Sequence, residues 1–422
     1  MSTPATKPRV LHLSFVAGRA LRDAGGGRLG TVEDLIVLLE GEEYPPVSGA
    51  LARIAGREVF VPAARIAELD DDGVRLAGAQ LDLQPFRRRP GEVLLKRDVL
   101  ARQLINVDGA RLVRTNEIEI APVDGWYRVV GVDTGPRGWL RRVLPRRLAR
   151  RIAPGTFLDW VSVEPFTGHV PSVRLRVPHP KLARLHPADV ADLVEAASHH
   201  EGGEILAALR TDGEREADVF EELDAHHQVE FLSERDDAAV ADLLLRMESD
   251  DAADLVLELP EDRREAVLDC LPVARRRRLR TLLGYDPATA GGLMSPHYVC
   301  MYRQATAVDV FERIRRSDAS AEALAWVFVM NERHRLRGAV ALPDVVRAAP
   351  ETRLGEIAGV AKQVRADADL EEVARLMADY DLAVVPVVDG DERVVGVVTV
   401  DDVLELVLPR GWRRTFGVLG ED

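Results

Sequence analysis

The sequence lacks any long hydrophobic run. Hydrophobic residues make up 46% of its 422 residues. No window approaches the roughly 18 to 20 consecutive apolar residues that a membrane-spanning helix requires. Its first residues, MSTPATKPRVLHLSF, are too polar to be an export signal, and their apolar stretch is too short. We therefore expect a cytoplasmic chain that does not span a membrane and cannot itself form a pore.

Cysteines and catalytic motifs are also scarce. The two cysteines, Cys270 and Cys300, are too few for a disulfide framework or a thiolate metal site, which favours a reducing compartment. The sequence has no nucleophile–base set, no Walker loop and no His/Cys ligand cluster. Its two histidine pairs, 199–200 and 226–227, fall in segments predicted to be exposed helix. Enzyme activity is therefore not expected.

Positive charge is outnumbered by negative charge and is unevenly distributed. The net charge of -14 argues against nucleic acid as a partner, because phosphate contacts need a basic surface. Residues 186–262 hold about two dozen acidic residues against about four arginines, whereas residues 137–151 hold about seven arginines and no acid. The basic segment 137–151 is predicted either to neutralise the acidic region as a solvated helix or loop, or to contact a membrane surface or an acidic partner. Its apolar residues would lie on one side of a helix: Trp139, Leu140, Val143 and Leu144.

The region from residue 10 to about residue 166 is predicted to be rich in β-strands, with short alternating runs between Gly, Asp and Pro turns. It contains an internal repeat. The string RALRDAGGGRLGTVEDLIV from Arg19 aligns without gaps to RQLINVDGARLVRTNEIEI from Arg102, which predicts two small β-barrels. The pattern GRLGTVEDLIV followed by REVFVP resembles the PRC-barrel family, whose members are small modules that dock to partners.

The pattern becomes helical from residue 187. The short amphipathic units ADLVEAA, ADVFEELD, ADLLLRME, ADLVLELP and EAVLDCLP recur at spacings of roughly 12 or 24 residues. Such units cannot bury their apolar faces singly, so we expect them to stack as an array of short helices. From Gly291 two β-α-β-β-α patterns follow in tandem, and in the second Val373, Leu376 and Met377 share one helix face.

These elements, in this order, resemble the cytosolic part of the MgtE family of magnesium channels and transporters. The resemblance covers about 187–408 and rests on HPADVADLV, YDPATAGGLMSPHYV, LEEVARLMADYD and VVGVVTVDDVLELV. The tandem units resemble CBS domains, which pair into regulatory modules. The family's plug helix and membrane pore would follow the last CBS helix, where this sequence has LPRGWRRTFGVLGED.

The predicted fold class is therefore multidomain α+β. Small PRC-like β-barrels come first, followed by an α-helical superhelical domain of the MgtE N-terminal type and a tandem CBS pair. The expected boundaries are 10–90 for the first PRC-barrel-like domain, 91–175 for a second with the basic segment, 183–284 for the helical domain, and 291–350 and 351–410 for the two CBS domains.

The resemblance implies a Mg²⁺ site between the helical array and the CBS pair. Matched by position, its ligands would be Asp218, Asp250 and Asp254 on the array, and Asp369, Glu371, Asp381, Asp402 and Glu405 on the CBS pair. The residues themselves support part of this site. Asp250 and Asp254 are four apart, so they project from one helix face and offer the oxygen ligands that Mg²⁺ prefers.

Several of the candidate ligands also have an ordinary structural explanation. Helix capping alone could explain Asp369, which lies three residues before Glu372, and Asp402, which lies near the start of the last helix. Asp381 falls at a helix C-terminus, where the macrodipole opposes negative charge, so either a divalent cation or plain solvent must offset it. The Asp250 and Asp254 pair could be an exposed acidic face.

A second cofactor is implied by the CBS resemblance, because CBS pairs can hold ATP or another adenine nucleotide. Gly396, Thr399 and Asp402 have the G-x-x-T-x-x-D spacing that resembles the ribose-contacting motif, whereas the first unit has Ala341 in place of the hydroxyl. The residues that could contact a nucleotide, including one aromatic to stack on the base, are Trp326, Asp344, Thr399 and Asp402.

The function predicted from the sequence is that of a cytosolic magnesium-responsive regulatory protein. It would bind Mg²⁺ between the helical domain and the CBS pair, dimerise through its CBS domains and act on a partner such as a membrane transporter or a membrane surface. Two alternatives remain open: a CBS protein that senses adenine nucleotides, and a PRC-type adaptor for a membrane partner.

Overall fold

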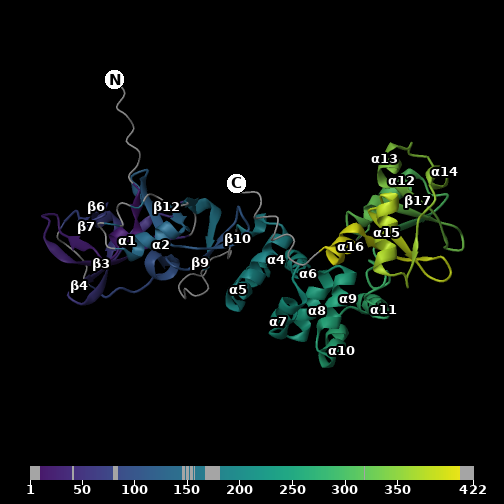
Figure 1. The fold of residues 1–422 in the computed structure, drawn as a ribbon, viewed down its shortest axis with the longest axis horizontal. Coiled ribbons are helices and arrows are strands. Elements are labelled where there is room, and N and C mark those ends of the chain that lie inside the picture. The colour runs from purple at the N-terminus through teal and green to yellow at the C-terminus, as the bar shows by residue number, and fades with distance from the viewer. Residues whose placement is uncertain are drawn as a thin grey trace, which may run out of the picture. The chain divides into compact units, whose positions relative to one another are not determined.

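The computed structural model describes residues 10–39, 42–78, 84–144, 148, 152, 155, 157–166, 181–317 and 319–408. The chain forms two compact units, Met1–Asp224 and Ala225–Asp422, and each is described by itself (Figure 1). Among the described residues, no helix is both long enough and apolar enough to cross a bilayer.

The N-terminal part of the first unit consists of strands, as its alternating sequence predicts. The first repeat copy contains β2 (Ala20–Arg22), β3 (Arg28–Leu38), β4 (Val47–Ile54), β5 (Arg57–Pro62), η1 (Ala63–Arg65), β6 (Ile66–Asp70) and β7 (Gly73–Leu76). The second contains β9 (Gln103–Asn106), β10 (Arg111–Arg114), β11 (Glu117–Val123), β12 (Trp126–Asp133), β13 (Phe157–Asp159), η3 (Trp160–Ser162) and β14 (Val163–Pro165). A short strand and a helical turn precede each copy: β1 (Leu11–His12) with α1 (Leu13–Val16), and β8 (Glu92–Leu94) with η2 (Leu95–Val99). The sequence repeat therefore has a structural counterpart.

The described strands form open sheets. One has the order β5-β4-β3-β2-β7-β6 with β8 paired to β3, a second has the order β1-β11-β12-β13, and a third has the order β10-β9-β14. Among the described strands, no pairing joins the two outer strands of any of these sheets. The prediction of a β-rich region is confirmed, but the closed barrels expected from the sequence are not formed by these strands. The physical reason is that neither copy builds its sheets from its own strands alone, because β8 joins the sheet of the first copy at β3 and β1 joins a sheet of the second copy at β11.

The two copies exchange their first strands. β1 precedes the first copy but pairs with β11 of the second, with Leu11 opposite Ile120. β8 precedes the second copy but pairs with β3 of the first, with Leu94 opposite Ile36. One hydrophobic core contains buried residues of both copies. The boundary expected between residues 90 and 91 separates the sequence copies, but strands cross it in both directions.

Two buried carboxylates at equivalent repeat positions connect the copies. Asp34 of β3 accepts hydrogen bonds from the backbone N–H groups of Lys96 (2.7 Å) and Arg97 (3.0 Å) in η2. Glu117 of β11 accepts hydrogen bonds from the backbone N–H of Ser14 in α1, at 3.1 Å, and from its hydroxyl. Burial raises the pKa of Asp34 to about 6 and raises that of Glu117. Each copy thus caps the helical turn that precedes the other copy.

The predicted helical array is present in both units. The first unit contains α4 (Pro187–Ala196), α5 (His199–Leu209) and α6 (Gly213–Glu221). The second unit begins with α7 (Ala225–Ser233), α8 (Asp237–Arg246), α9 (Ser249–Glu258), α10 (Glu261–Cys270) and α11 (Val273–Leu282). The sequence sets the helix starts, because Ser198 caps α5, Asp236 caps α8, and Pro260 and Pro272 directly precede α10 and α11.

The two β-α-β-β-α patterns complete the second unit. The first comprises β15 (Val299–Tyr302), α12 (Ala307–Ile314), η5 (Ala323–Ala325), β16 (Trp326–Met330), β17 (Leu336–Ala341) and α13 (Leu342–Arg347), followed by the one-turn helix α14 (Leu354–Ile357). The second comprises β18 (Val364–Arg365), α15 (Leu370–Tyr380), β19 (Val384–Val388), β20 (Val394–Thr399) and α16 (Val400–Val407). Phe328 and Leu336 of the first pattern share a buried cluster with Val384 and Val397 of the second. The two patterns therefore pack together as the sequence predicts.

The segment with the AGGLM string joins the helical array to the second CBS-type pattern. The backbone N–H of Ala290 donates to the carbonyl of Ala368 at 2.8 Å. Met294 packs against Gly396 of β20, where a Cβ atom would lie 2.7 Å from the Met294 sulfur. A residue without a side chain is therefore required at position 396, and this packing holds the end of the array near β20 and α16.

Candidate metal centre

Asp250 lies in the first turn of α9 and is buried within the second unit. Its neighbours along the helix, including Ala252, Ala253 and Val256, face the core, and the same packing leaves Asp250 only 8% exposed. Among the described residues, its Oδ1 atom has no hydrogen-bond partner. Burial of a carboxylate oxygen without a partner is unfavourable, so this atom requires a proton or a cation.

The carboxylate of Asp402 adds negative charge at the same place. Asp402 lies in the first turn of α16. Burial is the main cause that raises the pKa of Asp250 well above its ordinary value, and the charge of Asp402 is the next, followed by smaller contributions from Glu248 and Asp254. The sequence assigned Asp250 and Asp402 to opposite sides of one site. The structure brings their charges together.

Asp402 also caps its own helix. Its Oδ2 atom accepts hydrogen bonds from the backbone N–H of Thr399 at 3.1 Å and from the Thr399 hydroxyl at 2.6 Å. This reciprocal arrangement is a capping box, which was one structural alternative for Asp402. The cap fixes the direction of the carboxylate, so capping and ion binding are compatible roles for this residue.

The second candidate ligand on α9, Asp254, lies one turn after Asp250. Its side chain is more exposed than that of Asp250. Partial desolvation, followed by the charge of Glu258, nevertheless raises the pKa of Asp254 to about 6. Asp254 contributes to the pKa shift of Asp250, as expected for two acids at i and i+4.

Polar residues that the sequence reasoning missed surround the start of α9. The Ser249 hydroxyl lies 3.1 Å from His297 Nε2 and accepts a 2.6 Å hydrogen bond from Arg275. Arg275 is buried and also donates to the carbonyls of Leu244 and Met247 at the end of α8. Arg275 is hidden in the run RRRR, which resembles a solvated face. Its place four residues before the buried Leu279 was the available signal.

Three predicted ligands on the second CBS-type pattern have local roles or are exposed. Asp369 caps α15 by accepting a 2.8 Å hydrogen bond from the backbone N–H of Glu372. Glu371 is exposed and forms an ion pair with Arg375. Asp381 is the exposed C-cap of α15 with a φ of 53°, a left-handed conformation that Asp adopts more readily than most residues. This backbone conformation is a reason for Asp381 that the sequence reasoning did not consider.

The remaining predicted ligands are not placed at Asp250. Asp218 lies on α6 in the first unit, where it is exposed, and partial desolvation followed by the charge of Glu214 raises its pKa. Because the units are described separately, Asp218 is not positioned relative to α9. Glu405 belongs to α16, but its side chain lies outside the described part of the structure.

The predicted nucleotide contacts are spread over several elements. Trp326 is half-buried and packs against the cluster between the two CBS-type patterns. Asp344 is exposed and lies 3.3 Å from Arg347. Thr399 is buried and bonded to Asp402, as described above. On the same CBS-type pair, Arg303, Arg333, Arg335 and Arg337 are among the residues that line a cavity of about 340 Å³.

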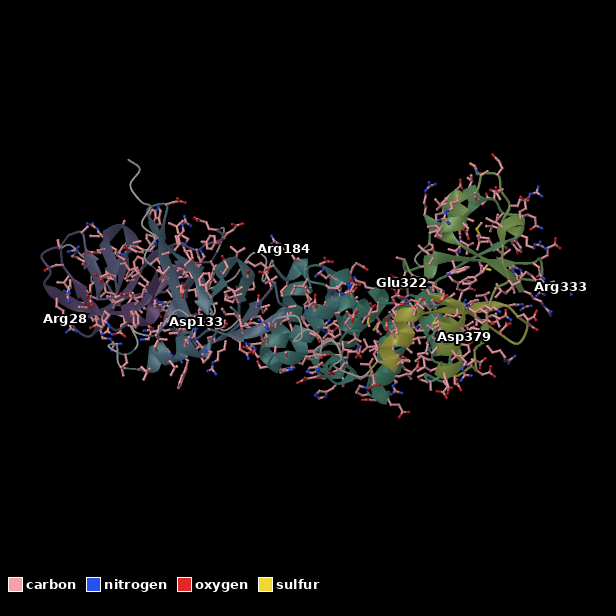
Figure 2. The ribbon with its side chains drawn as sticks, turned by 45° about the horizontal axis from the view of Figure 1, so that its top comes forward. Arg28, Asp133, Arg184, Glu322, Arg333 and Asp379 are labelled. Atoms are coloured by element: carbon pink, nitrogen blue, oxygen red, sulfur yellow. The ribbon has the colours of Figure 1, made fainter. Side chains whose placement is uncertain are left out.

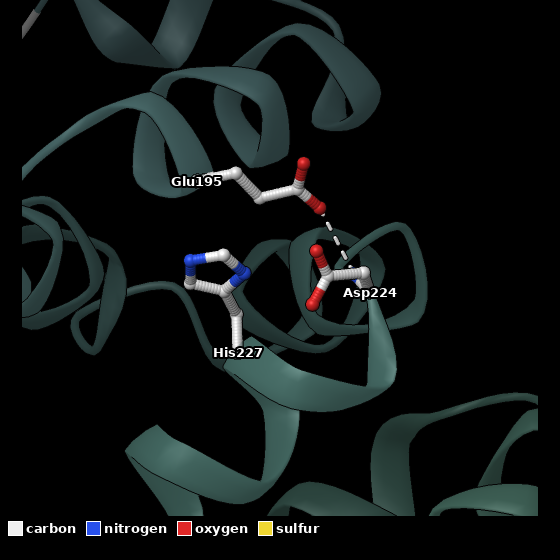
Figure 3. Close-up of side chains that lie close together, drawn as sticks. All are labelled: Glu195, Asp224 and His227. Atoms are coloured by element: carbon white, nitrogen blue, oxygen red, sulfur yellow. Dashed lines mark hydrogen bonds between the residues drawn. The ribbon is translucent and has the colours of Figure 1, made fainter. Parts of the chain in front are cut away.

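A different acidic contact lies at the end of the first unit. The backbone N–H of Asp224 donates a 2.9 Å hydrogen bond to the Glu195 carboxylate, and Figure 3 draws both residues with His227, three positions further along the chain. The sequence analysis considered His227 only as part of an exposed histidine pair. This hydrogen bond links α4 to the residue before α7, so Glu195 has a structural role there.

Known protein families match both the helical array and the second CBS-type pattern. Residues 185–288 match the model of the MgtE intracellular N domain, and residues 361–409 match that of the CBS domain. The magnesium transporter MgtE of Thermus thermophilus is 44% identical over 140 residues, which is 33% of this chain and 31% of that protein. MgtE of Bacillus subtilis is 28% identical over 226 residues, which is 53% of this chain and 49% of that protein. The matches thus span less than half of either relative.

Among solved structures, the cytosolic domain of the Mg²⁺ channel MgtE in complex with ATP is 36% identical to this chain, with a TM-score of 0.50. That match covers 53% of this chain and 92% of the other. An array of short acidic helices followed by a CBS-type pair defines a class of regulatory domains. The chain belongs to the MgtE family, since its MgtE N domain and CBS domain are homologous to the cytosolic part of MgtE.

Proposed function

We propose that this protein is a cytoplasmic magnesium-responsive regulator that binds Mg²⁺ between α9 and α16 and acts on a partner. The observation that carries this proposal is the buried Oδ1 of Asp250, which has no hydrogen-bond partner among the described residues and lies within reach of the Asp402 charge. The relatives in Thermus and Bacillus are named magnesium transporters. We assign to this chain the sensing of the ion, because the homology covers the cytosolic part.

The chemistry of the site suits Mg²⁺. Asp250 and Asp402 supply carboxylate oxygens from two helices, and Asp254 adds a third carboxylate one turn along α9. Mg²⁺ prefers such hard oxygen ligands and keeps several of its own waters, so a few carboxylates are sufficient. The cation takes the place of the proton that the raised pKa of Asp250 otherwise favours. Asp369, Glu371 and Asp381 remain candidates for outer positions in the proposed site, whereas Asp218 and Glu405 stay predictions from the family resemblance alone.

Charge repulsion gives this site its regulatory effect. Two carboxylates about 6 Å apart repel each other by roughly 2 to 3 kcal/mol at an effective dielectric constant of ~20. Without a cation this repulsion weakens the contact between α9 and α16, and Mg²⁺ reverses it. A site built only from carboxylates and waters has modest affinity, which suits a sensor of the free cellular ion.

Isothermal titration of the full chain with MgCl₂ tests the proposal. We expect Asp250→Asn to weaken Mg²⁺ binding by at least about tenfold, because the amide keeps the shape of the carboxylate but carries no charge. Asp262→Asn is the matched control, since Asp262 lies in the first turn of α10 as Asp250 does in α9, but is exposed. Equal affinities of the wild type and Asp250→Asn would rule out this site.

Dimerisation through the CBS-type pair is part of the proposal, but the apolar face of Val373, Leu376 and Met377 noted in the sequence is not the face that we propose for it. Val373 and Met377 are buried within their own unit and cannot meet a second copy. Val308 of α12 and Val346 of α13 are exposed on two helices that contact each other, and this face supports a homodimer contact. Light scattering should show a dimer for the full chain and a monomer after Val308→Lys with Val346→Lys.

Adenine-nucleotide sensing is a second candidate function. It is favoured by the relative whose cytosolic domain was solved with ATP, and by the arginine-lined cavity of the CBS-type pair. ATP titration with and without Mg²⁺ distinguishes the candidates. Heat of ATP binding that is unchanged in Asp250→Asn, without any response to Mg²⁺ alone, favours the nucleotide sensor.

The β-rich region gives the proposed regulator a means of reaching its partner. Its resemblance to PRC-barrel modules favours an adaptor role, with a membrane transporter as the regulated protein. Pull-down with residues 10–166 and with the full chain, followed by identification of membrane-fraction proteins, tests this part. Recovery of the same transporter by both supports it, and recovery by neither contradicts it.

A further inference from the structure

Helix α2 (Pro136–Val143) has an unusual orientation on the β-rich region. Its arginine at position 141 is buried, with only 2% of its surface exposed, whereas Trp139 and Leu140 are 47% and 37% exposed. Leu144, which follows the helix, is also exposed. A surface helix normally buries its apolar side and exposes its charges. Here Trp139 and Leu140 are exposed while Arg141 is buried.

Polar contacts hold α2 in this orientation. The Arg141 guanidinium lies 3.3 Å from the buried carboxylate of Asp133 at the end of β12, and Figure 2 labels Asp133. The Asn116 side-chain amide donates to the carbonyls of Thr134 and Gly135, at 2.8 and 3.1 Å, just before the helix. These contacts fix the helix start and its rotation.

Close packing against Asp133 adds to the anchor. A Cβ atom at Gly138 would lie 2.9 Å from the Asp133 carboxyl carbon, so only glycine permits this approach. Burial, followed by the charge of Arg141, lowers the pKa of His12 to about 4, which keeps its ring neutral beside the guanidinium near pH 7. The exposure of Trp139 and Leu140 is therefore a consequence of a built contact and not of a loose helix.

The segment containing α2 is an insertion between equivalent strands of the repeat. In the first copy, β4 and β5 form a hairpin joined by Ala55 and Gly56 alone. In the second copy, the equivalent strands β12 and β13 pair from Asp133 to Phe157, and residues 134–156 lie between them. Because the first copy forms its hairpin without such a segment, the fold does not require α2.

The charges beside the exposed apolar side chains indicate what covers them. Arg137 is exposed and Arg142 is half-buried, and neither guanidinium has an ion-pair or hydrogen-bond partner among the described residues. The sequence from residue 134 to residue 158 contains no Asp or Glu, although the whole chain has a net charge of -14. An aromatic and leucines flanked by arginines match the apolar–polar boundary of a membrane with anionic headgroups.

We propose that α2 docks the protein onto an anionic lipid surface, with Trp139, Leu140 and Leu144 entering the headgroup region and Arg137 and Arg142 contacting lipid phosphates. A lipid surface fits better than an acidic protein, because tryptophan is favoured at the membrane–water interface. This docking is independent of the proposed Mg²⁺ site, whose residues all lie in other elements.

Flotation of the full chain with lipid vesicles tests the proposal. We expect binding to vesicles in which about a third of the lipid is phosphatidylglycerol, and little binding to phosphatidylcholine alone. Trp139→Ser with Leu140→Ser should lower the partition coefficient at least about tenfold, because the apolar contact is lost. Replacing Arg137 by Gln should lower it about fivefold, which corresponds to about 1 kcal/mol.

Trp126→Ser is the matched control. Trp126 is as exposed as Trp139, at 50%, but lies at the end of β12 opposite to Arg137 and Arg142, so its loss should leave vesicle binding unchanged. Circular dichroism and the Mg²⁺ titration should be unaltered in every variant, which separates a docking defect from unfolding and from a failure of the metal site.

Absence of flotation with anionic vesicles overturns the proposal. Equal loss with Trp126→Ser, or tighter binding to polyglutamate than to the vesicles, also overturns it, and the second result favours an acidic protein.

Discussion

Asp250 at the start of α9 and Asp402 at the start of α16 bring two negative charges together inside the second unit. One is buried, and its Oδ1 atom has no hydrogen-bond partner among the described residues. The other is held by its own capping box. Only a proton or a cation can neutralise these charges, so we expect the repulsion between Asp250 and Asp402 to depend on pH and on Mg²⁺.

The stability of the protein without metal should rise when the charge of Asp250 is removed. In Asp250→Asn the buried charge is absent, and we expect the free energy of unfolding in EDTA to increase by about 1 to 3 kcal/mol at neutral pH. Urea denaturation followed by circular dichroism measures this. The same variant should lose most of the stabilisation that Mg²⁺ gives to the wild type, while Asp262→Asn should keep it. A metal-free protein that is destabilised by Asp250→Asn would mean that the carboxylate makes a favourable contact.

Protons should compete with Mg²⁺. Burial raises the pKa of Asp250 well above its usual value, and partial desolvation raises that of Asp254 to about 6. Each carboxyl must lose its proton to bind the ion, so the affinity for Mg²⁺ should fall as the pH is lowered from 7 toward 5. Calorimetric titrations across this range measure the change.

In the absence of metal, the free energy of unfolding should change with pH in the opposite direction to the affinity for Mg²⁺. The folded protein holds protons that the unfolded chain releases near the ordinary carboxyl pKa, so stability without Mg²⁺ should decrease as the pH rises through about 6. This decrease should be smaller with saturating Mg²⁺, because the cation then stabilises the deprotonated form. Parallel pH profiles with and without Mg²⁺ would contradict the shared site.

Hydrogen exchange should locate the response to Mg²⁺. If the ion bridges α9 and α16, amides in the first turns of both helices should exchange more slowly in MgCl₂ than in KCl of equal ionic strength. Mass spectrometry of peptides covering 249–254 and 400–404 measures this, with α12 as the internal control. Equal protection by KCl would mean that the effect is only screening of an acidic surface.

The sequence predicted periodic features better than tertiary contacts. The tandem β-α-β-β-α patterns, the short helices and the repeat are visible as spacings of apolar residues, and all are present. Strand exchange between repeat copies leaves no such signal, because β1 and β8 would alternate in the same way beside any partner. Arg141 was counted with its neighbours as surface charge, since its partner Asp133 becomes close only through folding.

The candidate site was only partly predictable for the same reason. The i,i+4 pair of Asp250 and Asp254 is a local pattern, so its shared helix face could be derived from the sequence. The effect of the Asp402 charge on Asp250 depends on the tertiary fold of the second unit, and the pairing of these residues came only from the family resemblance. The left-handed conformation of Asp381 could not be seen in the letters MADYD, where the residue looked like a charge without a local reason.

The reciprocal caps of the repeat should respond unequally to amide substitutions. Asp34 accepts backbone hydrogen bonds through both oxygens, from Leu35 and Lys96 at Oδ1 and from Arg97 at Oδ2. In Asp34→Asn the new amide group faces a backbone N–H that can only donate, so one buried donor is left unpaired. We expect a loss of about 1 to 3 kcal/mol in the free energy of unfolding.

Glu117→Gln should be tolerated better, although Glu117 is equally buried. Its Oε1 receives the backbone N–H groups of Ser14 and Ile118, and its Oε2 receives the Ser14 hydroxyl. The Gln oxygen can keep both N–H contacts while its amide donates to the hydroxyl, which can reverse its role and accept. Urea denaturation of both variants should therefore give a clearly smaller loss for Glu117→Gln than for Asp34→Asn. With Ser14→Ala added, Asp34→Asn should keep its full cost, since the two caps hold different turns. If Glu117→Gln is as damaging as Asp34→Asn, the negative charge itself, and not the pairing of donors, stabilises these caps.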